Sequence, residues 1–122
     1  MRDFDHERLE VYQRALDFVT AAQTIRAHLP AGNQGLSDQL HRAAMSIVLN
    51  IAEGAGEFAS KEKVRFYRIA RRSATECAAI LDLSQRIGVA SPAVGPAKAQ
   101  LQTIVAMLVA LAKCHEEKPK RS

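Results

Sequence analysis

The chain has 122 residues and a formal net charge of +4, and 48% of its residues are hydrophobic while 25% are charged. This length suits one domain with a buried core, the composition is ordinary for a soluble protein, and the basic charge allows an acidic partner such as nucleic acid. No run of roughly 18 apolar residues is present and the N-terminus is too charged for a signal peptide, so we expect a cytoplasmic protein with no membrane span.

The first predicted helix runs from about residue 5 to about residue 28. Its apolar residues recur at helical spacing in two neighbouring stripes, one of Leu9, Tyr12, Leu16 and Val19 and the other of Val11, Ala15, Phe18, Ala22 and Ile25. Together the stripes are wide enough to face two neighbouring helices. Pro30 ends the helix, because proline disfavours helical geometry in the residue before it.

The second predicted helix covers about residues 38–55, with Ser37 as its N-cap and Asp38 in its first turn. Its core face is formed by Leu40, Ala44, Ile47 and Ile51. A polar stripe lies on the opposite side, made of Arg42, Ser46, Asn50 and Glu53, and Met45 and Leu49 border it. Glycine is common just past the last turn, so Gly54 and Gly56 indicate the helix end.

The polar stripe of the second helix has two interpretations. It serves capping, hydrogen bonding between subunits and solvation, or it contacts a ligand. Apolar residues nearly all round a helix indicate contacts on several sides, so this helix is expected to touch more than its own bundle.

The third predicted helix covers about residues 61–87, with Ser60 as N-cap and Gly88 as the stop. Its core side is predicted as Phe66, Ala70, Ser73, Cys77, Ile80 and Leu81. The two cysteines, Cys77 and Cys114, lack the CxxC spacing of a zinc or redox site. We therefore interpret Cys77 as a small core residue.

The fourth predicted helix covers about residues 92–116 and opens with Ser91 as cap and Pro92 at its first position. Its inward side is Ala97, Leu101, Ile104, Leu108 and Leu111, while its back carries Ala106, Val109 and Ala110. An exposed apolar back face of this kind usually marks an interface. Residues 119–122 are predicted to be a frayed basic tail.

Four helices with short connections predict an all-α fold, an antiparallel up-down-up-down four-helix bundle formed by residues 1–118 as one domain. The helices carry more apolar surface than one copy can bury, so we expect self-association. The predicted intersubunit contacts are Met45, Leu49, Ala106, Val109 and Ala110.

A basic stripe follows the third helix. Lys61, Arg65, Arg68 and Arg72 are separated by steps of four, three and four residues and share one side, with Arg71 and Lys63 flanking them. Such stacked cations can follow phosphates without reading sequence. The alternative is a solvated face that Glu62 and Glu76 partly neutralise. Single-strand binding usually adds stacking aromatic residues, and here only Tyr67 is close, so we expect any contact with nucleic acid to be directed at the backbone and sensitive to salt.

Motifs for catalysis are missing from the sequence. There is no Glu-x-x-His or HExxH for a metal, and no GxGxxG or GxxxxGK[ST] loop for a nucleotide. Some helical-bundle ribonucleases have four to six residues between an arginine and a histidine; Arg2 and His6 approach this pattern but have only three residues between them. We therefore expect no catalytic residue, no metal and no cofactor, and keep a nuclease as a remote alternative.

The sequence resembles a known family over essentially the whole chain, most specifically in the second and third predicted helices. The residues that carry the resemblance are Gln39 to Ala44, Ser46-Ile47, Asn50 to Gly54, Phe66-Tyr67, Ile69 to Arg71, Ser73 and Glu76. They resemble the bacterial four-helix-bundle proteins encoded in intervening sequences of 23S ribosomal RNA genes, and also the accessory variability determinant of diversity-generating retroelements. The chain departs from the usual pattern at Val48, Glu57 and Arg72, where the family has proline, a basic residue and glycine.

The resemblance implies a ring-like homopentamer. For the retroelement branch it also implies a basic surface that engages nucleic acid and a reverse transcriptase. We therefore expect a non-enzymatic scaffold that docks RNA or DNA through Lys61, Arg65, Arg68, Arg71 and Arg72, alone or with a protein partner. The alternative is a structural or protein-binding oligomer with no affinity for nucleic acid.

Overall fold

A computed structural model describes residues 4–89 and 91–116 of the chain. In these ranges the chain forms a short 3-10 helix, η1, and four α-helices, with no strand, which confirms the all-α prediction. The elements are η1 (Asp5–Arg8), α1 (Glu10–Ala27), α2 (Gln34–Gly56), α3 (Ser60–Arg86) and α4 (Val94–His115). Arg2 and the predicted tail at residues 119–122 lie outside the described residues.

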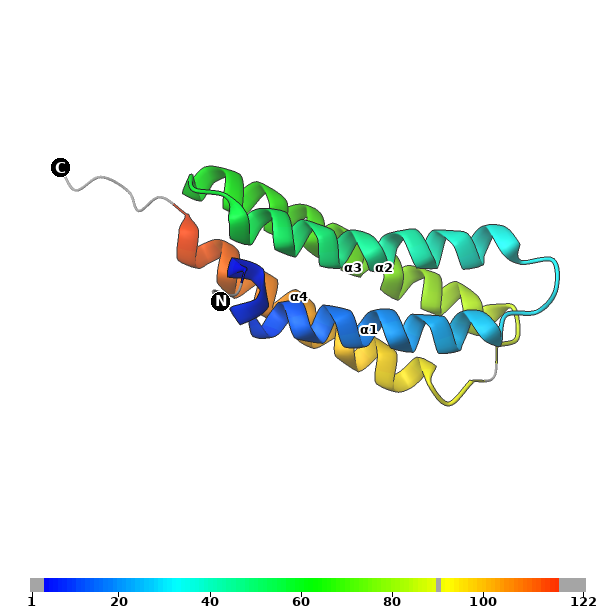
Figure 1. Cartoon of the computed structure of the whole chain (residues 1–122). Helices are drawn as coiled ribbons and strands as arrows, with labels where there is room; N and C mark the ends of the chain where they lie inside the picture. The colour runs from blue at the N-terminus through cyan, green and yellow to red at the C-terminus, as the bar shows by residue number, and fades with distance from the viewer. Residues whose placement is uncertain (1–3, 90, 117–122) are drawn as a thin grey trace.

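The four long helices lie side by side, and each packs against two others (Figure 1). α1 and α3 each contact both α2 and α4, whereas the described parts of α2 and α4 do not contact each other. The loops after α1 and after α3 lie at one end of the molecule, and the loop after α2 lies at the other end, near η1 (Figure 1). Consecutive helices are therefore neighbours in space.

The buried core runs along the length of the molecule between the helices. α1 contributes the second of its two predicted stripes, from Val11 to Ile25, while the first stripe is half-buried or, at Leu16, exposed. α2 contributes its predicted core face, and α4 contributes all of its predicted inward residues except Leu111, which is half-buried. Cys77 is fully buried in α3, as predicted.

α2 begins one turn earlier than predicted, so Ser37 is not its N-cap. The helix starts at Gln34, and the Ser37 N–H donates to the Asn33 carbonyl at 3.1 Å. The Ser37 hydroxyl is buried and accepts a hydrogen bond from Arg26 Nε of α1 at 2.9 Å. A tertiary contact has therefore replaced the capping bond that the local sequence indicated.

The starts of α3 and α4 also differ from prediction. Ser60 is the first residue of α3, and its N-cap, Ala59, makes no side-chain cap bond. α4 begins at Val94, so Pro92 precedes the helix. The Ser91 hydroxyl accepts from the Ala93 N–H at 3.2 Å and so closes the turn that leads into α4. The end of α3 is as predicted, because Gly88 adopts a φ of 102° just past the last turn.

Gly54, one of the two glycines predicted to mark the helix end, lies instead inside α2, whose last residue is Gly56, and it is buried against α3. A Cβ at this position would lie 2.7 Å from Cε1 of Tyr67. The glycine therefore lets α2 and α3 approach closely at this level. Tyr67 itself is buried, while Phe66, which the sequence placed in the core, is only half-buried.

α4 has an unusually apolar composition. By length and composition Val94–His115 is the one helix in the described ranges that meets the criteria for a membrane span, and 28% of the relevant stretch is buried inside the molecule. A core helix of a soluble protein meets the same criteria, so this is weak evidence for a span. The sequence of α4 contains no uninterrupted run of about 18 apolar residues, so the expectation based on such a run did not identify this helix.

Candidate nucleic-acid interface

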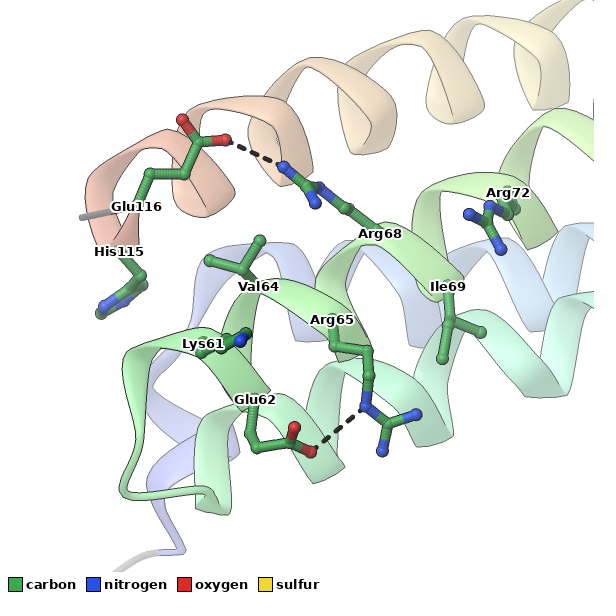
Figure 2. A pocket seen from close by; sticks show the side chains of 9 residues that line it. All are labelled: Lys61, Glu62, Val64, Arg65, Arg68, Ile69, Arg72, His115 and Glu116. Carbon is green, nitrogen blue, oxygen red and sulfur yellow. Dashed lines mark hydrogen bonds and ion pairs between the residues drawn. The ribbon is translucent and has the colours of Figure 1, made fainter. Parts of the chain in front are cut away.

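α3 and the C-terminal end of α4 form a groove of about 670 Å³ at one end of the molecule. Lys61, Arg65, Arg68 and Arg72, the four cations of the predicted stripe, all line this groove together with Val64, Ile69, Glu62, His115 and Glu116 (Figure 2). The helical spacing of the four cations places them in a row on α3. From Lys61 to Arg72 this row is about 16 Å long at 1.5 Å per residue. We call it the basic row.

Two carboxylates engage two members of the basic row. Glu62 Oε2 lies 3.2 Å from Arg65 Nε on the same helix, and Glu116 Oε1 lies 3.3 Å from an Arg68 guanidinium nitrogen (Figure 2). All of these side chains are roughly half exposed, so each ion pair contributes little to stability. A phosphate, which offers the same kind of oxygen acceptor, can therefore replace either carboxylate at small cost.

Arg71 and Lys63, which flank the row in the sequence, have separate positions. Arg71 is exposed and lines a second hollow of about 330 Å³, where Arg68 and Lys113 also lie. Because Arg68 lines both the groove and this second hollow, the two are adjacent. Lys63 instead turns away from the groove, since its Nζ donates to the carbonyls of Gly54 at 3.2 Å and Ala55 at 2.9 Å. It therefore caps the C-terminal end of α2, where cations are favoured by the helix dipole.

The aromatic residues near the basic row are not those that the sequence suggested. Tyr67, the aromatic residue that the sequence placed close to the row, is only 2% exposed, so it cannot stack on a base. Phe66 is half-buried, with the Arg65 guanidinium 4.6 Å above its ring. Phe58, in the loop between α2 and α3, is fully exposed, and sequence reasoning missed it. The signal available was a phenylalanine in a short connection, outside every helical stripe.

The polar stripe of α2 divides into hydrogen-bonding and exposed parts. The Ser46 and Ser73 hydroxyls share a 2.7 Å hydrogen bond between α2 and α3. Asn50 Nδ2 donates to the Ser46 carbonyl at 2.8 Å and to the Ser46 hydroxyl at 3.0 Å. Arg42 and Glu53 are exposed. The middle of the stripe therefore fastens two helices together within one chain, which neither of the predicted interpretations had specified.

The five predicted intersubunit residues lie at the surface of the single chain. Met45 is 41% exposed and Leu49 is 56% exposed on α2, and on α4 Ala106 and Ala110 are exposed and Val109 is half-buried. Since α2 and α4 do not contact each other in the described chain, these residues form two separate patches, an α2 patch and an α4 patch.

Two buried groups have perturbed acidity. Burial raises the pKa of the Cys77 thiol to about 12, and the nearby Glu76 carboxylate adds to the effect. Burial also raises the pKa of Tyr67. Neither group reaches the groove as a reactive side chain. Within residues 4–89 and 91–116, no group of three or more His, Cys, Asp or Glu side chains is arranged to hold a metal ion.

Comparison with known proteins gives a family and a fold. The sequence model of the family described as 23S rRNA-intervening sequence protein matches residues 7–110. A solved structure from Bacteroides thetaiotaomicron, a protein of unknown function from the S23 ribosomal protein family, matches with a TM-score of 0.76 and 21% sequence identity. The match covers 84% of this chain and 98% of that chain. A comparison with curated proteins gave no significant match.

Proposed function

Because the chain belongs to the family of 23S rRNA-intervening sequence proteins, we propose that it is a non-enzymatic, self-associating scaffold whose basic row docks the phosphate backbone of RNA or DNA. The observation that carries this proposal is the convergence of Lys61, Arg65, Arg68 and Arg72 on one groove. In this proposal the assembly works in the cytoplasm, away from membranes, and a protein such as a reverse transcriptase is a further possible partner.

The charge balance of the groove supports a phosphate ligand. The groove contains four Lys and Arg side chains against two carboxylates, Glu62 and Glu116. Both carboxylates already accept from guanidinium groups in the way that phosphate oxygens do. Each phosphate that the row neutralises releases counterions, so a four-cation contact predicts that the logarithm of the affinity falls with the logarithm of salt concentration with a slope of roughly −3 to −4.

Self-association is supported by the separate α2 and α4 patches. Contacts between two different patches on successive copies are head-to-tail, and such contacts close into a ring when the rotation allows. We therefore propose a cyclic homo-oligomer, with the pentamer as the specific form, built from up-down-up-down bundles. The positions of the loops at alternating ends support that connectivity (Figure 1).

The test of nucleic-acid docking is charge reversal in the groove with a matched control outside it. The variant Arg65→Glu/Arg68→Glu should lose most of its affinity for a labelled RNA or DNA and show a shallower salt slope. The control Arg14→Glu/Arg86→Glu changes the net charge equally, at exposed positions that do not line the groove. It should bind nearly as well as the native protein.

Equal loss in both variants would mean that the groove has no special role and that only total charge matters. No loss in either variant would remove the docking proposal and leave the second candidate, an oligomer that is structural or binds protein. The exposed apolar side chains Met45 and Leu49 favour that candidate. Sedimentation of Leu49→Glu tests the assembly separately, and unchanged native-size particles would refute the role of the α2 patch.

A further inference from the structure

Phe58 is the most exposed large hydrophobic side chain among the described residues. It is 100% exposed in the loop between Gly56, the last residue of α2, and Ser60, the first residue of α3. Every other phenylalanine is at least partly covered, with Phe4 next at 72% exposure. Among residues 4–89 and 91–116, no packing contact accounts for the position of this phenyl ring.

The position of Phe58 relates it to the basic row. Lys61, the first cation of the row, follows Phe58 by three residues, so their Cα atoms lie within about 11 Å of each other at the maximum reach of the chain. The backbone that carries the ring therefore lies next to the N-terminal end of the row. With the row itself about 16 Å long, ring and row together match roughly five to eight nucleotides of a stacked strand at ~3.4 Å per nucleotide.

Cations alone do not distinguish single strands from duplexes, because both present phosphates. The other aromatic residues beside the row are more covered than Phe58: Tyr67 is buried, Phe66 is half-buried with the Arg65 guanidinium over its ring, and His115 is half-buried in the groove wall. A fully exposed phenyl ring supplies a free face for a base. Base stacking on aromatic side chains tolerates any sequence but requires an unpaired base, because paired bases are already stacked on their neighbours.

We propose that Phe58 is a stacking platform for an unpaired base, and that the preferred ligand of the groove is therefore a single-stranded segment of nucleic acid. This inference rests on the docking function proposed above and specifies its ligand. The phosphates of the segment follow the basic row along α3, and one base at its end turns onto the phenyl ring.

The experiment compares three probes of equal length, about 12 nucleotides. They are an oligothymidylate, a strand of the same backbone with abasic sugars, and a duplex. The proteins are the native chain, Phe58→Ala, Phe58→Trp and, as a control, Phe4→Ala. Phe4 is an exposed phenylalanine that precedes η1, and η1 packs on α1 and α2 and not on the helices that line the groove.

The native protein should bind the oligothymidylate more tightly than the abasic strand or the duplex. Phe58→Ala should weaken oligothymidylate binding by about 5-fold to 150-fold, the loss expected for one stacked base, and should leave the other two probes within about twofold. Phe58→Trp should retain the preference and Phe4→Ala should not change it. Circular dichroism establishes that each variant keeps its helices.

The possible failures separate the two proposals. If Arg65→Glu/Arg68→Glu binds all three probes like the native protein, the docking function fails. If that variant loses binding but Phe58→Ala keeps the native preference for bases, only the stacking inference is overturned. If Phe58→Ala instead changes the sedimentation coefficient and keeps the preference, Phe58 is a contact between copies of the chain and the stacking inference is likewise overturned.

Discussion

Substituting Gly54 by alanine tests the close contact between α2 and α3. The added Cβ would lie 2.7 Å from Cε1 and 3.0 Å from Cδ1 of Tyr67, and 3.2 Å from Cβ of Phe66. Carbon atoms pack at about 3.5–4.0 Å, so at least two of these contacts are far too short. The Tyr67 ring is 2% exposed and enclosed by the core, so it cannot rotate into solvent to make room.

Two effects of opposite sign determine how much Gly54→Ala changes the free energy of unfolding. Alanine is favoured over glycine inside a helix by up to about 1 kcal/mol. Inserting a methyl group into a packed core costs about 1–3 kcal/mol, and the short distances place Gly54→Ala in the upper half of that range. We therefore expect a net loss of about 1–2 kcal/mol in the free energy of unfolding. Gly56→Ala is the matched control, because its Cβ would meet nothing within 4 Å.

Urea unfolding followed by circular dichroism, at one fixed protein concentration, measures both changes. Gly54→Ala should lower the midpoint by roughly 1 M, given a slope of about 1–2 kcal/mol per molar urea for a chain of this size. Gly56→Ala should leave the urea midpoint unchanged or raise it by a few tenths of a molar unit. If Gly54→Ala is as stable as the native protein, α2 and α3 are not held at the distance described here.

Three further predictions concern single side chains. Lys63→Met should lower the free energy of unfolding by about 1 kcal/mol, because the carbonyls of Gly54 and Ala55 at the end of α2 lose the charged donor that bridges them, and only that of Gly54 keeps a bond from the Glu57 N–H; affinity for nucleic acid in a binding titration should stay the same. Glu62→Gln combined with Glu116→Gln should strengthen nucleic-acid binding several-fold, since the carboxylates compete with phosphate for arginines; weaker binding would count against the groove. Folding raises the pKa of the Cys77 thiol from 9.0 to about 12. The neutral thiol therefore stabilises the folded chain fully below pH 9. Between pH 9 and 12 the free energy of unfolding should fall by up to about 1.4 kcal/mol per pH unit. Cys77→Ala should flatten that part of the stability profile, whereas Cys114→Ala, at an exposed thiol, should not.

The sequence predicts the order of the four long helices and most of their core faces because these depend on local periodicity, although residues predicted to begin the first helix form the separate η1, Asp5–Arg8. The stripe from Val11 to Ile25 is apolar at helical spacing, and its burial follows directly. The starts of helices were less predictable. Ser37 has the side chain of an N-cap, but Arg26, eleven residues away on another helix, uses its hydroxyl instead. No local pattern reports such a tertiary hydrogen bond.

The candidate site was predicted in part for the same reason. The basic row is a helical repeat, so its grouping on one side of α3 could be read from spacing, and the structure places all four cations on one groove. The walls of the groove depend on how the end of α4 meets α3, which spacing does not determine. Lys63 belongs to the same charge cluster in the sequence, yet the nearby end of α2 captures its ammonium group. The burial of Tyr67 and the exposure of Phe58 were not predictable in the same way, because burial is set by the neighbouring helix.

The hydrogen bond between Ser46 and Ser73 determines which alignment of α2 and α3 is allowed. Apolar surfaces are non-directional, and two such helices can slide along each other by one turn, about 5.4 Å, and still exclude water. Such a slide would part the two hydroxyls and leave the Ser73 oxygen, which is buried, facing hydrocarbon without a partner. The serine pair therefore penalises alignments of the two helices that are shifted by one turn, and it acts together with the fit of Tyr67 against Gly54 at the same contact.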